Sequence, residues 1–127
     1  MPFVQITLLE GKSKKTVSDI SDSVHRALID EFNIPEKDKF QTIREVKPGN
    51  LIFPPDYLKI PHTDDIVFIH ITAKEGRTVE MKKKLYAKIT SLISDSASIN
   101  TDDVFIVLSE NKEENWSFGR GIAQLVK

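Results

Sequence analysis

The sequence has no cysteine, and its 127 residues include a single tryptophan and two methionines. Without cysteine the chain can form neither a disulfide framework nor a reactive thiolate. The 18 basic and 19 acidic residues almost cancel, which disfavours a dedicated nucleic-acid or membrane-surface binder. The apolar runs have the length of strands and are too short for a membrane span or a signal peptide. We therefore expect one soluble, cytoplasmic domain over residues 1–127 that has no nucleic-acid or membrane partner.

The first third of the sequence reads as strand, helix and strand. Residues that favour strands dominate Phe3 to Leu9, which predicts the first strand. Ser13 can cap a helix whose end is signalled by Asn33-Ile34-Pro35, and Phe40 to Val46 predicts a second strand. The apolar residues of the predicted helix recur at spacings of three and four; they are Val17, Ile20, Val24, Leu28 and Phe32.

The second half of the sequence repeats this plan. Ile66 to Ala73 predicts a strand, Thr78 can cap a helix, and Val104 to Leu108 predicts a closing strand. Six pairs of identical residues share one separation of 65 positions: Phe3 and Phe68, Ile6 and Ile71, Gly11 and Gly76, Ile34 and Ile99, Asp38 and Asp103, and Phe40 and Phe105. A constant offset with strands and helices in phase indicates an internal duplication.

The duplication predicts the fold class, which is α+β. Two β-α-β units, residues 2–46 and 66–110, would form a four-stranded sheet with both helices on one face. Because the third and fourth strands are apolar on both faces, the uncovered face should meet another subunit. Residues 47–65 are expected to form a connecting loop. The tail, residues 111–127, is expected to form a hairpin that lays aromatic rings against a pocket or a neighbouring subunit.

Pro2 is the most unusual candidate for chemistry, because it directly follows the initiator methionine and precedes a strand. Removal of Met1 would leave Pro2 with a free secondary amine held by that strand. An ordinary α-amino group has a pKa near ~8, and apolar surroundings or a nearby cation would lower it. A base poised near neutrality suits proton abstraction beside a carbonyl. Many proteins begin Met-Pro for no catalytic reason, so Pro2 alone does not decide the function.

Several short motifs together make the sequence resemble the tautomerase superfamily, and in particular its malonate semialdehyde decarboxylase branch. The resemblance spans nearly the whole chain. Its motifs are Pro2, Leu9-Glu10-Gly11, Asp38-Lys39-Phe40-Gln41-Thr42, Lys47-Pro48-Gly49, Asp102-Asp103-Val104, Glu110-Asn111 and Trp116-Ser117-Phe118-Gly119-Arg120-Gly121. The last of these is the most specific.

The resemblance implies a homotrimer with Pro2 at the floor of each pocket and Asp38 as the aspartate that orients or activates water. It places the two substrate-binding arginines of that branch around Lys74 and Arg77. The sequence departs from the pattern here: Lys74 stands at the first arginine, and Arg77 aligns only if one residue is inserted before it. A lysine is a point charge and cannot form a planar bidentate clamp on a carboxylate. The departure counts against decarboxylation more than against tautomerisation.

Each of these residues also has a purely structural reading. Asp38 could form a turn before a strand, and Arg77 could be a surface arginine at a helix start. Trp116 and Phe118 are expected near the pocket mouth, although they could instead clip the tail to the body. Arg120 could pair with a carboxylate across a subunit interface. His25, His62 and His70 lack metal-ligand spacing, so we expect neither a metal nor another cofactor.

Three functions follow from the sequence, in this order. The first is a cofactor-independent tautomerase that acts on 2-oxo acids such as phenylpyruvate, or on a dienol, with Pro2 as general base. The second is a decarboxylase or hydratase of the malonate semialdehyde type, with protonated Pro2. The third is a non-catalytic trimeric domain. An RNA-binding sheet is disfavoured because its strands would display stacking aromatics among basic residues.

Overall fold

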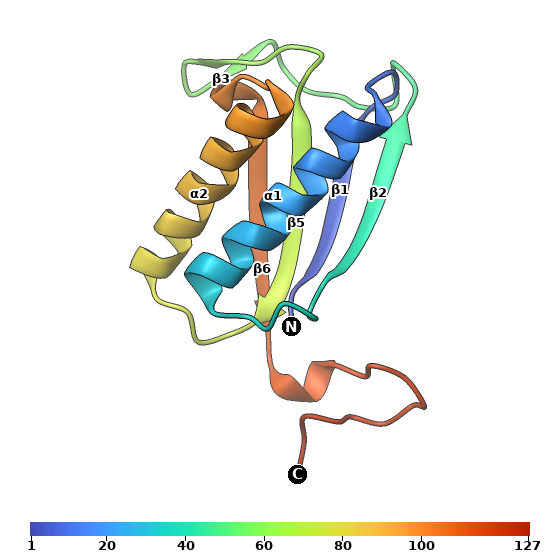
Figure 1. The fold of residues 1–127 in the computed structure, drawn as a ribbon, viewed down its shortest axis with the longest axis vertical. Coiled ribbons are helices and arrows are strands. Elements are labelled where there is room, and N and C mark those ends of the chain that lie inside the picture. The colour runs from blue at the N-terminus through green and yellow to red at the C-terminus, as the bar shows by residue number, and fades with distance from the viewer.

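A computed structural model describes residues 1–127 and shows a four-stranded sheet with both long helices on one face (Figure 1). The strands lie in the order β2 (Phe40–Val46), β1 (Phe3–Leu9), β5 (Val67–Lys74) and β6 (Val104–Asn111). The outer pairs are parallel, whereas β1 and β5 are antiparallel. The α+β class and the four-stranded sheet are confirmed. β6 runs further than predicted because it stays paired with β5 up to the end of that strand.

The two helices show the duplication most clearly. α1 (Lys14–Phe32) and α2 (Val79–Ala97) each have 19 residues, and their bounds differ by the same 65 positions. Ser13 and Thr78 cap their amino ends, each accepting a hydrogen bond from the backbone N–H three residues on. The helices end at Asn33 and Ser98, which both adopt the left-handed conformation. Local sequence signals therefore set both helices.

The core lies between the helices and the covered face of the sheet. Alternate residues of β1 and β5 point into it, so these strands show a strict period of two in burial. Burying one such side chain contributes about 1.5–3 kcal/mol. The largest fully buried side chains are Ile6, Leu8, Ile20, Leu28, Ile66, Ile69, Ile71, Leu85, Ile89, Ile93 and Ile99.

The segment 47–65, expected to be a loop, contains a miniature ribbon. β3 (Asp56–Tyr57) pairs with β4 (Ile60–Pro61) in antiparallel fashion. Leu58 and Lys59 form the two-residue turn between them, and both have positive φ angles, of 50° and 65°. The sequence did not indicate this turn, because neither leucine nor lysine is a residue type that favours positive φ angles. The ribbon lies at the end of the sheet opposite to the amino terminus (Figure 1).

The predicted hairpin in the tail is not formed. After β6 the chain makes one short 3-10 helix, Glu113–Asn115, and no further strand. Gly119, Arg120 and Gly121 all have positive φ angles and turn the chain. The backbone N–H of Phe118 then donates to the side chain of Gln124. This side-chain contact takes the place of a strand ladder. A further 3-10 turn, Thr101–Asp103, precedes β6.

The second face of the sheet is not covered by a helix (Figure 1). Phe40 is 52%, Phe105 41% and Val107 44% exposed on this open face. His70 lies among them, and its Nε2 is 2.8 Å from the hydroxyl of Ser109. No helix in the structure has the length and hydropathy of a membrane-crossing segment.

Candidate active site

Four strand ends and the tail meet at one end of the sheet, and the amino terminus lies among them (Figure 1). β1 and β2 start here, whereas β5 and β6 end here, because β1 is antiparallel to β5. Pro2 immediately precedes β1 and is buried. Continuing the register of β1 and β5 by one residue sets Pro2 opposite Ala73, which is 1% exposed. The sheet therefore holds the second residue of the chain in a fixed position.

Asp38 binds the amino terminus directly. The ammonium nitrogen of Met1 donates to Oδ2 of Asp38 at 2.9 Å. The side chain of Asp38 is 27% exposed, so the pair is partly shielded from water. Asp38 lies in the turn that leads into β2. The purely structural role considered from the sequence, a turn before a strand, therefore also fits its position. The carboxylate that the sequence singled out thus lies within hydrogen-bond distance of an amine next to Pro2.

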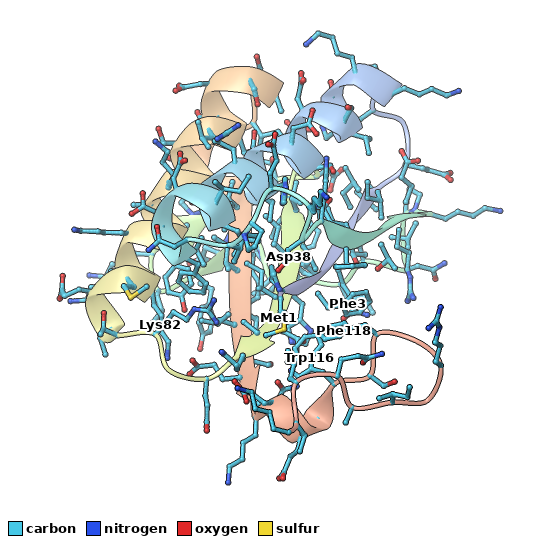
Figure 2. The ribbon with its side chains drawn as sticks, turned by 60° about the horizontal axis from the view of Figure 1, so that its bottom comes forward. Met1, Phe3, Asp38, Lys82, Trp116 and Phe118 are labelled. Atoms are coloured by element: carbon cyan, nitrogen blue, oxygen red, sulfur yellow. The ribbon has the colours of Figure 1, made fainter.

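An aromatic pocket of about 350 Å³ lies beside this ion pair. Trp116 and Phe118 stack with their ring centroids 5.8 Å apart, and Nε1 of Trp116 donates to Oδ1 of Asn111 at 2.5 Å. Asn111 is the last residue of β6, so this bond ties the tail to the sheet. In Figure 2, Met1 lies between Asp38 on one side and Trp116 and Phe118 on the other. The lining residues are Met1, Pro2, Phe3, Phe40, Trp116, Ser117 and Phe118.

The expected substrate-binding cations do not line this pocket. Nζ of Lys74 lies 3.2 Å from Oε1 of Glu113. Nη1 of Arg77 donates to the backbone carbonyl of Lys74 at 2.8 Å. The guanidinium of Arg77 also lies over the ring of Phe32, 4.9 Å from its centroid. Both side chains are thus near the same end of the sheet but are engaged with other groups.

Arg120 also lies outside the Pro2 pocket. It is exposed in the turn of the tail, with a φ angle of 60° between two glycines. The structure therefore brings together Pro2, Asp38, Trp116 and Phe118. It leaves Lys74, Arg77 and Arg120 around the periphery.

Sequence reasoning missed several contributors to this end of the molecule. Phe3 and Phe40 form part of the pocket wall, and their positions directly after Pro2 and two residues after Asp38 were a signal that could have found them. Asn111 accepts the hydrogen bond that anchors Trp116, and no local sequence pattern indicated this contact. Lys82 is the first of three consecutive lysines in α2, and its Nζ pairs with Oε1 of Glu110 at 2.6 Å. Figure 2 shows Lys82 well to the side of Met1. No three His, Asp or Glu side chains are arranged to share a metal ion.

Comparison with known families gives consistent matches. A family model described as tautomerase enzyme matches residues 38–119, and a second model with that description matches residues 2–60. The probable tautomerase YusQ of Bacillus subtilis (strain 168) is 42% identical over 127 residues, which cover the whole of both chains.

Two solved structures resemble the chain both in fold and in sequence. A malonate semialdehyde decarboxylase, studied for its decarboxylase and hydratase activities, has a TM-score of 0.90 and 28% identity, with 97% of this chain and 95% of that chain covered. The FG41 malonate semialdehyde decarboxylase inhibited by 3-bromopropiolate has a TM-score of 0.90 and 34% identity, with 96% and 92% covered.

Proposed function

Because the chain belongs to the tautomerase family of enzymes, we propose that it interconverts the keto and enol forms of a 2-oxo acid, with Pro2 as the general base once Met1 is removed. The proposal names an aryl 2-oxo acid such as phenylpyruvate as the substrate class.

The contact between the amino terminus and Asp38 carries the proposal. The terminal amine bonds to a partly shielded carboxylate at 2.9 Å, at the edge of an aromatic pocket. Loss of Met1 transfers the free amine to Pro2, which is buried and held by β1. A proton acceptor must lie within hydrogen-bond reach of the proton that it takes, and the pocket beside Pro2 provides that space.

In the enol-to-keto direction the reaction moves one proton. The neutral amine of Pro2 takes the proton from the enol hydroxyl, and the resulting ammonium gives a proton to the neighbouring carbon, so that the carbonyl forms and the amine returns to its neutral state. Asp38 would orient the amine and stabilise its charged form between the two transfers. Acid–base assistance of this kind typically contributes ~10²–10⁴ in rate.

The aromatic wall suits an aryl substrate. Trp116 and Phe118 present stacked rings, and Phe3 and Phe40 complete an apolar surface next to Pro2. An aromatic ring of the substrate can pack on such a surface in an offset or edge-to-face arrangement. The pocket therefore supports an aryl 2-oxo acid better than a small aliphatic one.

The carboxylate of the substrate requires a cation, and we assign this role to Lys74 and Arg77. The ion pair of Lys74 with Glu113 is half exposed, and such pairs contribute only about 0–1 kcal/mol. Lys74 can therefore exchange Glu113 for a substrate carboxylate at small cost. Arg77 is held more firmly, by a backbone carbonyl and by the ring of Phe32. Arg120, on the exposed turn of the tail, is proposed to pair with a carboxylate at the interface between subunits.

The open face supports a homotrimer as the working form. Phe40, Phe105 and Val107 expose large apolar areas on the face that no helix covers. Burying contiguous apolar surface of this kind favours association between copies. The number of three follows from the family resemblance.

A second function is favoured by one observation. Both solved structures described above are malonate semialdehyde decarboxylases with a TM-score of 0.90. Decarboxylation of a 3-oxo acid by a protonated Pro2 is therefore the alternative. The lysine at position 74 counts against it, since it offers no bidentate clamp. Product analysis with malonate semialdehyde separates the two reactions.

The test of the proposed function begins with intact mass spectrometry, which establishes that Met1 is absent from the sample. Conversion of phenylpyruvate from enol to keto form is then followed by ultraviolet absorbance for the wild type and Pro2→Ala. We expect at least a hundredfold loss of rate in the variant, from the usual size of general acid–base effects. Equal rates in the two proteins would exclude Pro2 as the base of this reaction.

A further inference from the structure

The segment that carries Asp38 has little regular structure of its own. It comprises residues 33–39, links α1 to β2, and lies at the same end of the molecule as the amino terminus (Figure 1). Two backbone hydrogen bonds lie within it, from the N–H of Asp38 to the carbonyl of Pro35 and from the N–H of Lys39 to that of Lys37. Its position relative to the sheet therefore depends largely on contacts made by side chains.

His25 provides such a contact on the amino-terminal side of Asp38. It lies on α1 and is only 9% exposed, and its Nε2 is 2.8 Å from the carbonyl oxygen of Glu36, two residues before Asp38. Because a carbonyl can only accept, Nε2 must carry the proton and donate it. The net value of a shielded hydrogen bond corresponds to a factor of about 2–10 in favour of the position that forms it.

Ser21, one helical turn before His25, provides a contact on the other side of Asp38. Its hydroxyl donates to Oε1 of Gln41 at 2.6 Å, and its backbone carbonyl accepts from Nε2 of Gln41 at 3.2 Å. Gln41 lies in β2, three residues after Asp38, so α1 holds the chain on both sides of the aspartate. A third contact, between Asp22 and Lys39 at 2.7 Å, is mostly exposed and contributes little.

The second repeat forms the same elements without these contacts. The residues that stand 65 positions after His25, Ser21 and Gln41 are Thr90, Tyr86 and Ile106. An isoleucine side chain has neither a donor nor an acceptor, so the reciprocal pair of bonds cannot form there. The strand, helix and strand still form with matching helix bounds. The fold of a repeat therefore does not require the contacts, which occur only in the repeat whose aspartate binds the terminal amine.

We propose that His25 is a positioning residue of the reaction, which holds the carboxylate of Asp38 at the terminal amine through the backbone of Glu36. The proposal rests on the function proposed for Pro2, because His25 would act only through the pair of Asp38 and the amine. Asp38 is the one charged side chain bonded to that amine, and no charged side chain lines the neighbouring pocket. No other group can therefore replace Asp38 when it is displaced.

The test measures the pKa of the Pro2 amine directly and requires no turnover. Protein labelled with [¹³C]proline, in which intact mass confirms the loss of Met1, is titrated with pH, and the Pro2 resonance is identified by its absence in Pro2→Ala. A nearby carboxylate favours the ammonium, so displacing Asp38 should lower this pKa. His25→Leu removes the donor and should lower the pKa by about 0.5, against about 1 for Asp38→Asn.

Two further substitutions of His25 separate the hydrogen bond from the fit of the side chain. His25→Gln carries an amide N–H near the position of Nε2 and should restore the wild-type pKa of the amine. His25→Asn is polar but too short to reach Glu36, and it should lower the pKa as His25→Leu does. It also keeps the test available if the leucine variant does not fold.

Ser23→Ala is the matched control. Ser23 lies on the same helix, is 6% exposed, and has its hydroxyl 3.0 Å from that of Ser96 on α2. Its substitution removes one shielded hydrogen bond without touching the segment of Asp38, so the pKa of the amine should stay at its wild-type value. In the Asp38→Asn background, His25→Leu should cause no further change.

The rate with phenylpyruvate provides the link to the reaction. His25→Leu should lower kcat about tenfold through the misplaced Asp38 and leave KM unchanged, because His25 does not line the pocket. An unchanged pKa in His25→Leu and His25→Asn would overturn the proposal, as would an equal fall in Ser23→Ala or a further fall in the Asp38→Asn background. If the pKa values changed as expected but Pro2→Ala kept its rate, His25 would still place Asp38 and the function proposed for Pro2 alone would be wrong.

Discussion

Asp38 and Asp103 occupy equivalent positions in the two repeats but have different partners. Asp38 is partly exposed and accepts a hydrogen bond from the ammonium of Met1 at 2.9 Å. Asp103 is 1% exposed and accepts the backbone N–H and the hydroxyl of Thr63, at 2.8 and 2.5 Å. One copy of the duplicated aspartate therefore faces a terminal amine, and the other fastens the connecting segment to β6.

The difference predicts that the same substitution destabilises the protein far more at one position than at the other. Asp103→Ala should lower the free energy of unfolding by about 2–4 kcal/mol, because it removes two hydrogen bonds to a charged group that is itself buried. Asp38→Ala should lower it by less than about 1 kcal/mol, since its pair is partly exposed. Urea unfolding at one fixed protein concentration measures both, because association would make stability concentration-dependent. Similar losses in the two variants would contradict this division of roles.

The proposed contact of Asp38 with the Pro2 amine predicts a shift in the pH profile. A neighbouring carboxylate favours the charged form of an amine, so Asp38→Asn should lower the pKa of the Pro2 amine. The neutral base would then persist to lower pH, and the acid limb of the kcat/KM profile should move down by about one pH unit. Asp38→Glu is the control and should keep the limb near its wild-type position. If the acid limb of the kcat/KM profile did not move in Asp38→Asn, the carboxylate of Asp38 would not influence the Pro2 amine.

The ion pair between Lys74 and Glu113 predicts that Glu113 weakens substrate binding by competing for Lys74. Glu113→Gln should free Lys74 and lower KM for phenylpyruvate by up to about fivefold, the factor that corresponds to a half-exposed ion pair. Glu114→Gln, one position along the same 3-10 turn, removes an equal charge and should leave KM unchanged. Lys74→Gln should raise KM. If Glu113→Gln and Glu114→Gln lowered KM equally, the effect would come from net charge and Lys74 would not be the anchor.

The parts of the fold that depend on local signals were predictable from the sequence. Phe3–Leu9 and Phe40–Val46 form strands with the predicted bounds, and Ser13 and Thr78 cap the two helices as expected. In each case the determining residues lie within one turn or one strand of each other. The apolar pattern of β5 and β6 likewise indicated the open face.

The parts that depend on distant contacts were not predictable. Asn111 holds Trp116, and this bond replaces the expected hairpin as the anchor of the tail. Arg77 turns onto Phe32, the last residue of α1 in the other repeat, and the four strands β2 to β5 lie between these two residues in the sequence. The spacing of residues along a sequence does not show which distant residue a given side chain contacts in the folded protein.

The exposed apolar side chains of the open face predict that a charge placed among them prevents subunit association and leaves the subunit folded. Val107 is 44% exposed, and the open-face cavity beside it is also lined by Arg44 and His70 but by no acidic residue. Val107→Lys would therefore bury a cation without a partner at the proposed interface, which is strongly unfavourable. The charge stays in water in the isolated subunit, so the fold should persist. We expect sedimentation velocity to give a mass near 14.4 kDa for the variant and about three times that value for the wild type.

Val79→Lys is the matched control for this experiment. Val79 is 65% exposed at the first turn of α2, on the helix-covered side of the molecule, and it receives the same substitution away from the open face. This variant should keep the wild-type mass. A monomeric wild type at tens of micromolar, or an unchanged mass of Val107→Lys, would show that the open face is not the interface. Equal dissociation of both variants would place the interface on the helices instead, and the apolar side chains of β6 would then need another explanation.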